Sequence, residues 1–557
     1  MADLGIDRGP VAILLIGGLP PLFLLSAHAP WWAVASAAAV LVLAGTPIRQ
    51  RSPIRWLSDR CAFRFGRAAR LRTLHEEPPL GDVEVAAGIC GILCDGDVLV
   101  AVIRLAPDLD LPTVIADRTV YTEDTVPVDL LLRMLDQYGI TVDIDIVTHG
   151  RRTRADLDYS KVYDQLIGSR PVIGQRSTWL VIRLDQRRNL QVLTRRGPCA
   201  ESGPRALAAA AHRIAARLRE REVAAHVLPA DALGEMTQWL HAGVEPSELR
   251  ERWGQLDTAH AGRTVTTFAV DWTRVETPGL EDCWRWHRGW TTIAIALSST
   301  GTRALVRYVG PSPEDPPPAY LRLLSGRQTT AFRATLPGAG SPSALRGKEF
   351  GPGLPAARTR ELRVAIGPSG QIIGALGGPD RHLLALPLFD PTRHEPRRRT
   401  IDVHAELAVA QQLVLRAVVV GAEVVVYSVH PQRWWQLIAA VGDPQALRLA
   451  TAAEADAAES TAGGIAVFDH LAPRAAAAPT VVALTEPGIG RHRDADLVID
   501  QIDATTVAVA IPMRTVTVEL IEPHGETRYF EPAADSERPE YDDSASASAA
   551  AANAWDE

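Results

Sequence analysis

The residues with the clearest potential for chemistry are two aspartates, Asp143 and Asp145, in a strand-like run of the sequence. Paired carboxylates at the end of a strand can hold a divalent cation against a nucleotide-sugar diphosphate, as in many glycosyltransferases. Both aspartates alternate with the apolar residues 142, 144 and 146, which favours a half-exposed strand over a metal site. The same Asp-x-Asp spacing carries little information, because it recurs at Asp95/Asp97, Asp108/Asp110, Asp156/Asp158 and Asp494/Asp496.

A second candidate is the basic run His149-Gly-Arg-Arg-Thr-Arg154, which follows the same strand. Its guanidinium groups have the geometry to bind an anion. A solvated basic loop, or a contact with another protein, is the more common role of such a run. We therefore predict that Arg151, Arg152 and Arg154 contact a partner protein.

The remaining motifs do not assemble a site. Gly347-Lys348 lacks the glycine spacing and the hydroxyl of a P-loop, and neither H-E-x-x-H nor G-x-S-x-G occurs. Gly367-Pro-Ser-Gly370 matches no dinucleotide fingerprint and favours ordinary turns. The aromatic run from Trp284 to Trp290 is typical of a core or an interface. The sequence thus predicts no catalytic, cofactor-binding or metal-ligating residue, no cofactor and no small-molecule substrate.

Five cysteines are scattered along the chain, an odd number that argues against a secreted disulfide framework and favours a reducing compartment. Cys90 and Cys94 have the spacing of half a metal site, but no second Cys or His pair accompanies them. We interpret them as buried apolar thiols.

The elements that must position these residues follow an alternating pattern from about residue 80 onward. Strand-like runs occur at 98–105, 141–147, 179–185 and 265–270, and helical periodicity at 126–138, 157–167 and 205–221. The second half predicts a strand at 383–388, a helix at 402–420, and strands at 423–429, 464–468, 480–484 and within 505–520. Alternation of this kind predicts a sheet covered by helices.

The N-terminal end has the character of a membrane anchor. Between Arg8 and Arg49 lie 40 residues without a formal charge, enough for two short helical spans. The arginine cluster at 49–72 places both ends of this transmembrane α-hairpin in the cytoplasm by the positive-inside rule. We therefore expect a two-pass protein of the bacterial inner membrane with the bulk of its chain in the cytoplasm. The predicted membrane-interface residues are Trp31, Trp32, Arg49, Arg51, Arg55 and Trp56.

Two alternatives stay open for this end of the chain. The run Ser26-Ala27-His28-Ala29 resembles a signal-peptidase site, although Pro30 follows it. Glycines and prolines at 17–21 would make the first span kinked or re-entrant, because proline removes a backbone donor that hydrocarbon cannot replace. We favour an uncleaved, kinked span.

Charge distinguishes the two ends of the 557-residue chain. The net charge of -8 gives no indication of nucleic-acid binding. Residues 49–72 contain eight arginines and one aspartate, whereas residues 531–557 contain eight carboxylates and one arginine. The predicted parts are a two-helix membrane anchor (1–48), an Arg-rich juxtamembrane segment (49–79), a first cytoplasmic α/β part (80–309), a Pro/Gly-rich linker or loop (310–357), a second α/β part (358–530) and an acidic disordered tail (531–557).

Several short motifs follow the hairpin in a distinctive order. They are Cys90 to Ile103, His149 to Arg154, Tyr163 to Gly168, Gln175 to Asp185, and Glu406 to Ala417 after a strand at 384–388. Together with the hairpin, over about residues 10–440, this order resembles the EccE component of the type VII (ESX) secretion systems of mycobacteria and related actinobacteria.

The resemblance implies a non-catalytic core subunit of a membrane-embedded protein secretion complex. Its implied partners are the EccB, EccC and EccD subunits, with EccC as the motor, and the lipid bilayer. The alternative function is a membrane-tethered, nucleotide-sugar-dependent glycosyltransferase-like enzyme that uses Asp143 and Asp145. An enzyme of that class should bind Mn²⁺ and a nucleotide sugar, whereas a scaffold should copurify with membrane subunits.

Overall fold

The computed structural model of the chain describes residues 60–61, 63–65 and 78–530, except 118, 276–279, 287–288, 299–300, 314, 344, 346–350, 379–380, 452–463, 475–477, 489–494 and 513. The predicted membrane anchor, the six predicted interface residues Trp31, Trp32, Arg49, Arg51, Arg55 and Trp56, and the acidic tail therefore lie outside the described residues. Within the described ranges, no helix is both long enough and apolar enough to cross a membrane.

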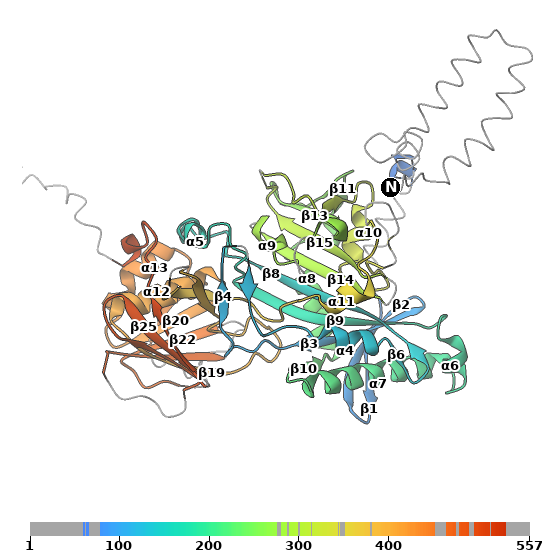
Figure 1. Ribbon diagram of the computed structural model, residues 1–557, viewed down its shortest axis with the longest axis horizontal. Helices are drawn as coiled ribbons and strands as arrows, with labels where there is room; N and C mark the ends of the chain where they lie inside the picture. The colour runs from blue at the N-terminus through green and yellow to red at the C-terminus, as the bar shows by residue number, and fades with distance from the viewer. Residues whose placement is uncertain are drawn as a thin grey trace, which may run out of the picture. The chain divides into compact units, whose positions relative to one another are not determined.

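The chain folds into two compact units, and each unit takes its residues from separate segments of the sequence. Unit 1 comprises the described residues within 1–106, 125–150 and 177–366, and unit 2 comprises those within 107–124, 151–176 and 367–557. Both contain strands and helices, so the predicted mixed α/β character is confirmed (Figure 1). The predicted parts, from the membrane anchor at 1–48 to the acidic tail at 531–557, stay a prediction. The stretch 310–357, predicted as a linker or loop, belongs to unit 1 and contains a short strand and a short helix.

In the part of the chain that the structure describes, unit 1 is built on a twelve-stranded sheet. Its main path runs β1-β2-β3-β9-β8-β14-β15-β13-β12-β11, with β10 paired to β3 and β16 paired to β13. The strands are β1 (Leu80–Val85), β2 (Gly88–Asp95), β3 (Val98–Leu105), β8 (Asp143–Arg151), β9 (Gln175–Asp185), β10 (Ala225–Val227), β11 (Arg250–Glu251), β12 (Leu256–Asp257), β13 (Thr264–Val270), β14 (Trp290–Leu297), β15 (Arg303–Gly310) and β16 (Leu321–Leu323).

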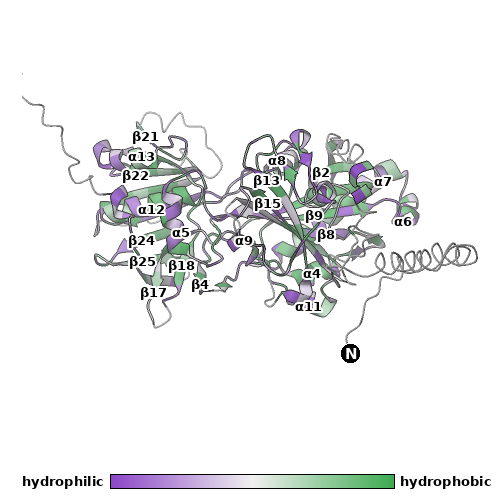
Figure 2. Cartoon of the chain, turned by 90° about the horizontal axis from the view of Figure 1, so that it is seen from above, coloured by the Kyte–Doolittle hydropathy of each residue, from purple (hydrophilic) through white to green (hydrophobic). Residues whose placement is uncertain are grey.

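Helices cover this sheet because their apolar positions recur on one side. The long α7 contacts β1, β2, β3 and β10 and carries both hydrophilic and hydrophobic residues (Figure 2). A core between α8 and the central strands includes Trp179 and Met236. Among the described residues from 78 onward, unit 1 contains the helices α4 (Val128–Arg133), α6 (Leu190–Thr194), α7 (Cys199–Arg219), α8 (Ala230–Leu240), α9 (Cys283–Trp286), α10 (Gln328–Arg333) and α11 (Ala356–Arg360), with 3-10 turns η1 (Pro246–Glu248) and η2 (Trp272–Arg274).

The helix predicted at 126–138 was too long. Only α4 forms there, and the small strands β6 (Asp136–Gln137) and β7 (Ile140–Thr141) follow as a hairpin. Tyr138 and Gly139 between them have φ values of 49° and 84°. Two successive left-handed residues make a tight hairpin turn, so the helix cannot continue through them.

The described residues of unit 2 also form a twelve-stranded sheet, with the order β21-β20-β22-β23-β19-β24-β25-β26-β17-β18-β4-β5. The strands from β21 to β24 along this path are parallel, and the remaining pairs are antiparallel. The strands are β4 (Thr113–Ile115), β5 (Val120–Tyr121), β17 (Gln371–Leu376), β18 (Leu383–Leu386), β19 (Arg399–His404), β20 (Glu423–Ser428), β21 (Leu447–Ala450), β22 (Gly464–Asp469), β23 (Thr480–Thr485), β24 (Leu497–Gln501), β25 (Thr506–Ile511) and β26 (Arg514–Glu519).

The main helix of unit 2, α12, connects β19 to β20 and packs on the parallel strands through aliphatic residues. The predicted helix at 402–420 was wrong at its start, because residues 399–404 form β19 with Ile401 and Val403 in the core. The helices of unit 2 are α5 (Tyr159–Ile167), α12 (Leu407–Val419) and α13 (Trp435–Val441), with 3-10 turns η4 (Pro431–Trp434) and η6 (Thr527–Tyr529).

Candidate functional site

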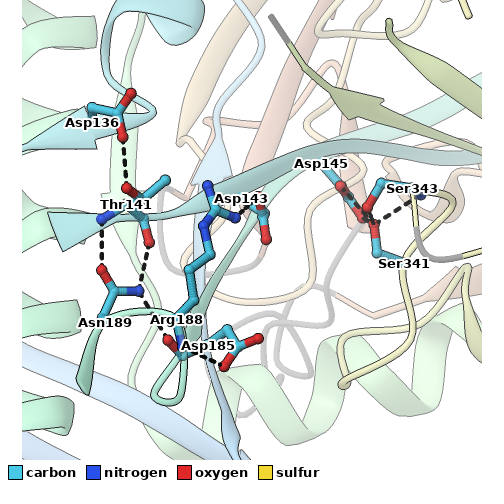
Figure 3. Close-up of polar contacts among 9 residues, drawn as sticks. All are labelled: Asp136, Thr141, Asp143, Asp145, Asp185, Arg188, Asn189, Ser341 and Ser343. Atoms are coloured by element: carbon cyan, nitrogen blue, oxygen red, sulfur yellow. Dashed lines mark hydrogen bonds and ion pairs between the residues drawn. The ribbon is translucent and has the colours of Figure 1, made fainter. Parts of the chain in front are cut away.

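Asp145 lies on β8 in the interior of unit 1, where it is 1% exposed. It forms an ion pair with Arg183 on the neighbouring strand β9. It also accepts a hydrogen bond from the Ser341 hydroxyl at 3.0 Å (Figure 3). Arg183 in turn donates from Nε to the Gly338 carbonyl at 2.6 Å. Burial raises the pKa of Asp145, and the contacts with Arg183 and Ser341 oppose that shift. The Asp145–Arg183 pair thus ties the loop at 338–341 to the sheet.

Asp143 has a different environment two residues earlier. Its side chain is 43% exposed, and its Oδ1 accepts a hydrogen bond from Nη1 of Arg188 at 3.0 Å. In Figure 3 the two carboxylates have separate partners, Asp143 with Arg188 and Asp145 with Ser341. An arginine already neutralises each carboxylate, and no group of three or more potential metal ligands occurs among the described residues. The alternative glycosyltransferase-like site is not supported.

The interpretation of β8 as a half-exposed strand was also wrong. Residues 144–150 are all buried, so both faces of the strand are covered. The strand lies between β9 and β14 in the middle of the sheet, and Asp145 occupies a buried position because Arg183 compensates its charge.

The three arginines predicted to contact a partner lie in unit 2, where each has an acceptor within the chain. Arg151 is half-buried and donates from Nε to the Gln175 side chain at 2.8 Å. Arg152 is buried and donates to the Gly168 carbonyl at 3.1 Å. Burial, followed by the neighbouring Arg154, lowers the pKa of Arg151 to about 10.

Arg154 joins two carboxylates through one guanidinium group. Its Nη2 lies 3.0 Å from Asp156 and 2.9 Å from Asp443, so it connects the start of the 151–176 segment to the residues after α13. Its backbone N–H also donates to the Val419 carbonyl at 2.8 Å. These contacts show an anchoring role within unit 2 for Arg154, and a contact with a partner protein at this loop stays a prediction.

The carboxyl edge of the parallel strands in unit 2 is the place where an open α/β sheet usually binds a ligand. At this edge His404 Nδ1 and Asp500 Oδ1 are 2.5 Å apart, and Asp469 accepts hydrogen bonds from Ser428 at 2.6 Å and Trp434 at 2.8 Å. The turn before α12 carries the exposed carboxylate of Glu406 and no glycine. A phosphate at the N-terminus of α12 would therefore meet a negative charge and not a glycine nest.

A pocket between α12 and the parallel strands offers no polar chemistry either, because aliphatic residues such as Leu413, Ile401 and Val482 line it. The Cys90 thiol is similarly inert. Cys90 is buried and free of disulfides, and burial with the nearby charge of Asp82 raises the pKa of its thiol to about 12. The interpretation of Cys90 as a buried apolar thiol is confirmed, whereas Cys94 is half-buried.

One contact was missed by sequence reasoning. Residues 60–61 and 63–65 are helical, and the Phe63 ring meets the Trp253 ring edge-on with centroids 5.4 Å apart. The Arg60 guanidinium lies 5.9 Å from the centroid of the same indole. Trp253 stands in the loop between β11 and β12, and its only signal in the sequence is a tryptophan next to the glycine of a short turn.

Comparison with known proteins shows which proteins this chain is similar to. The family described as "Putative type VII ESX secretion system translocon, EccE" matches residues 172–270. The ESX-2 secretion system protein EccE2 of Mycobacterium tuberculosis is 28% identical over 458 residues, which are 78% of this chain and 81% of that protein. The predicted resemblance to EccE is confirmed.

Two further EccE proteins are also similar to this chain. The ESX-1 secretion system protein EccE1 of Mycobacterium tuberculosis is 27% identical over 71% of this chain and 77% of its own length. The ESX-5 secretion system protein EccE5 of Mycobacterium marinum is 29% identical over 38% of this chain and 55% of its own length. The EccE match at 172–270 runs from the residues before β9 to the end of β13, so it contains Arg183 and Trp253 but neither aspartate of the Asp-x-Asp pair.

Proposed function

We propose that this chain is a non-catalytic core membrane subunit of a type VII (ESX) protein secretion complex, where it supports assembly or stability of the translocation machinery. The observation that carries the proposal is the similarity to EccE2 over 78% of this chain and 81% of that protein. The different environments of the two aspartates support the non-catalytic part, because Asp145 is buried with Arg183 while Asp143 pairs with Arg188 at the surface.

The proposal includes a two-pass anchor at residues 1–48 in the bacterial inner membrane, an Arg-rich juxtamembrane segment at 49–79 and an acidic tail at 531–557. Support comes from the charge-free run between Arg8 and Arg49 and from the arginines that follow it. The bulk of the chain would then lie in the cytoplasm.

The proposed partners are the membrane subunits EccB, EccC and EccD together with the lipid bilayer. A subunit without chemistry of its own acts through the surfaces that it presents to others. For the loop at 151–154 we keep the proposal that Arg151, Arg152 and Arg154 meet an acidic partner surface.

A gene deletion in the native host tests this function. We expect loss of ESX substrates from the culture medium and loss of the assembled membrane complex, both restored by the wild-type chain. The Asp143→Asn chain should restore them equally, because that carboxylate is half-exposed and carries no predicted chemistry. Normal secretion in the deletion strain would contradict the proposal, and an assembled but inactive complex with Asp143→Asn would favour an enzyme.

A further inference from the structure

The contact between the juxtamembrane residues and Trp253 marks one edge of unit 1. Phe63 packs edge-on against the indole with an interplanar angle of 87°, and Arg60 lies over the same ring. Trp253 belongs to the hairpin of β11 and β12, and β11 is the last strand on the main path of the sheet. In Figure 1 the short blue segment of residues 60–65 lies near the β11 label.

The indole is held firmly on the side of unit 1. The Trp253 carbonyl accepts a hydrogen bond from the Gly326 N–H at 2.6 Å. Gly326 has a φ of +75°, and a Cβ built on it would lie 2.7 Å from the indole ring. Only glycine fits there, because any side chain would displace Trp253 and the backbone conformation is left-handed. The indole ring is therefore a fixed surface against which Phe63 packs.

The side chains around the Phe63–Trp253 contact combine cations with an exposed aromatic ring. Phe65 is 84% exposed, and Arg60 and Arg64 on the same short segment are exposed as well. On the hairpin, Arg250 is exposed and the Arg252 side chain is 72% exposed, although it pairs with Asp257. Exposed cations next to an aromatic ring are the composition that binds at the headgroup level of an anionic membrane.

Chain length sets how far this edge can lie from the bilayer. Eleven residues, 49–59, separate the proposed membrane exit at Ile48 from Arg60. Eleven extended residues span at most about 40 Å. The Phe63–Trp253 contact then keeps the β11–β12 hairpin within that distance of the membrane exit. Six of the eight arginines in 49–72 lie outside the helical residues 60–61 and 63–65.

We propose that residues 60–65 and the β11–β12 hairpin, joined through Phe63 and Trp253, form the surface by which unit 1 lies against anionic lipid headgroups. This inference rests on the proposed membrane anchor. Lipid is favoured over an acidic protein because the segment is covalently continuous with the anchor and presents an exposed phenylalanine, which a headgroup layer accommodates.

Photocrosslinking of the full chain tests this surface. The chain is reconstituted in nanodiscs that contain a phosphatidylglycerol with a diazirine in its headgroup, and crosslinked peptides are located by mass spectrometry. We expect crosslinks in the anchor and at residues 250–257. Loss of one exposed cation by Arg252→Gln should lower the crosslinking at 250–257 roughly fivefold. Trp253→Ala should abolish the crosslinking at 250–257. Trp253→Phe should retain it, because an aromatic ring still packs against Phe63.

The matched control is Arg187→Gln. Arg187 is also an exposed arginine of unit 1, 81% exposed and paired with an aspartate, Asp97. It should leave the crosslinking at 250–257 unchanged. Crosslinks in the anchor without any at 250–257 would overturn this inference but would not contradict the proposed membrane subunit. The same conclusion would follow if the β11–β12 hairpin crosslinked in native membranes to a protein subunit and not to lipid. Absence of crosslinks in the anchor itself would instead count against the proposed function.

Discussion

The contribution of an ion pair to folding stability depends on its burial. Strand β8 carries two aspartates that differ in burial. Asp145 and Arg183 are both buried, with Ser341 as a further donor. Asp143 and Arg188 are both about half-exposed. Removing one partner of a buried pair leaves an uncompensated charge, whereas an exposed pair is screened by water and contributes little.

Asp145→Asn should therefore lower the free energy of unfolding of unit 1 by about 3–5 kcal/mol, because it leaves Arg183 charged and buried. Asp143→Asn should lower it by less than about 1 kcal/mol. Urea-induced unfolding, followed by tryptophan fluorescence, measures both. Equal effects of the two substitutions would contradict the structural role assigned to Asp145.

Asp124 in unit 2 gives a prediction for pH. Burial raises its pKa to about 6, against hydrogen bonds from the backbone N–H groups of Gly367 and Asp108. A carboxyl with a raised pKa in the folded state stabilises that state fully below its unfolded pKa, near 4, and this contribution is lost as pH rises through about 6. Asn in place of Asp124 should still accept the Gly367 N–H and avoids the cost of ionisation.

Asp124→Asn should therefore be more stable than the wild type at pH 7, and the difference should shrink to zero below about pH 4. Thermal unfolding of both chains between pH 4 and pH 7 measures the difference directly, because the other titrating groups are common to the two. A difference that is constant over this range would show that Asp124 does not titrate there.

At the scale of elements, the last described segment of unit 2 is locked to α12 by a buried charge pair. Arg416 and Glu526 are fully buried and 3.0 Å apart. Gln412 donates to Glu526 at 2.8 Å, and the Tyr159 hydroxyl of α5 donates to it as well. One carboxylate thus joins three segments that are distant in the sequence.

Glu526→Gln should destabilise unit 2 by about 3–5 kcal/mol, since Arg416 loses its counter-charge in the core. Hydrogen–deuterium exchange should then rise in α5 and α12. The matched control is Glu519→Gln, which breaks an exposed pair with Arg381 and should leave the exchange of both helices unchanged. Unchanged exchange in Glu526→Gln would show that the network does not hold these elements together.

Local periodicity predicted the elements best where the pattern is self-contained. The predicted strand at 98–105 coincides with β3, and the predicted helix at 157–167 contains α5. The failures depend on residues distant in the sequence. Burial of Asp145 requires Arg183 and Ser341, and Arg154 reaches Asp443. The interleaving of the two units and the Phe63–Trp253 contact are likewise non-local, and a hydrophobic pattern read along one segment contains no information about them.

At the scale of the whole molecule, the charge asymmetry and the uncharged run predict that both ends of the chain lie on the same side of the membrane. A cysteine introduced at His28, between the two proposed spans, should react with a membrane-impermeant maleimide added outside intact cells. A cysteine introduced in the tail, as in Ser544→Cys, should not. Labelling of the tail, or protection of position 28, would contradict the proposed transmembrane α-hairpin.

We propose above all that the chain is a structural subunit of an ESX membrane complex. Purification of the tagged full chain from native membranes in a mild detergent, followed by mass spectrometry, tests this claim most directly. We predict that EccB, EccC and EccD copurify with it in fixed proportion. Recovery of the chain alone, from membranes in which those three subunits copurify with one another, would contradict the claim.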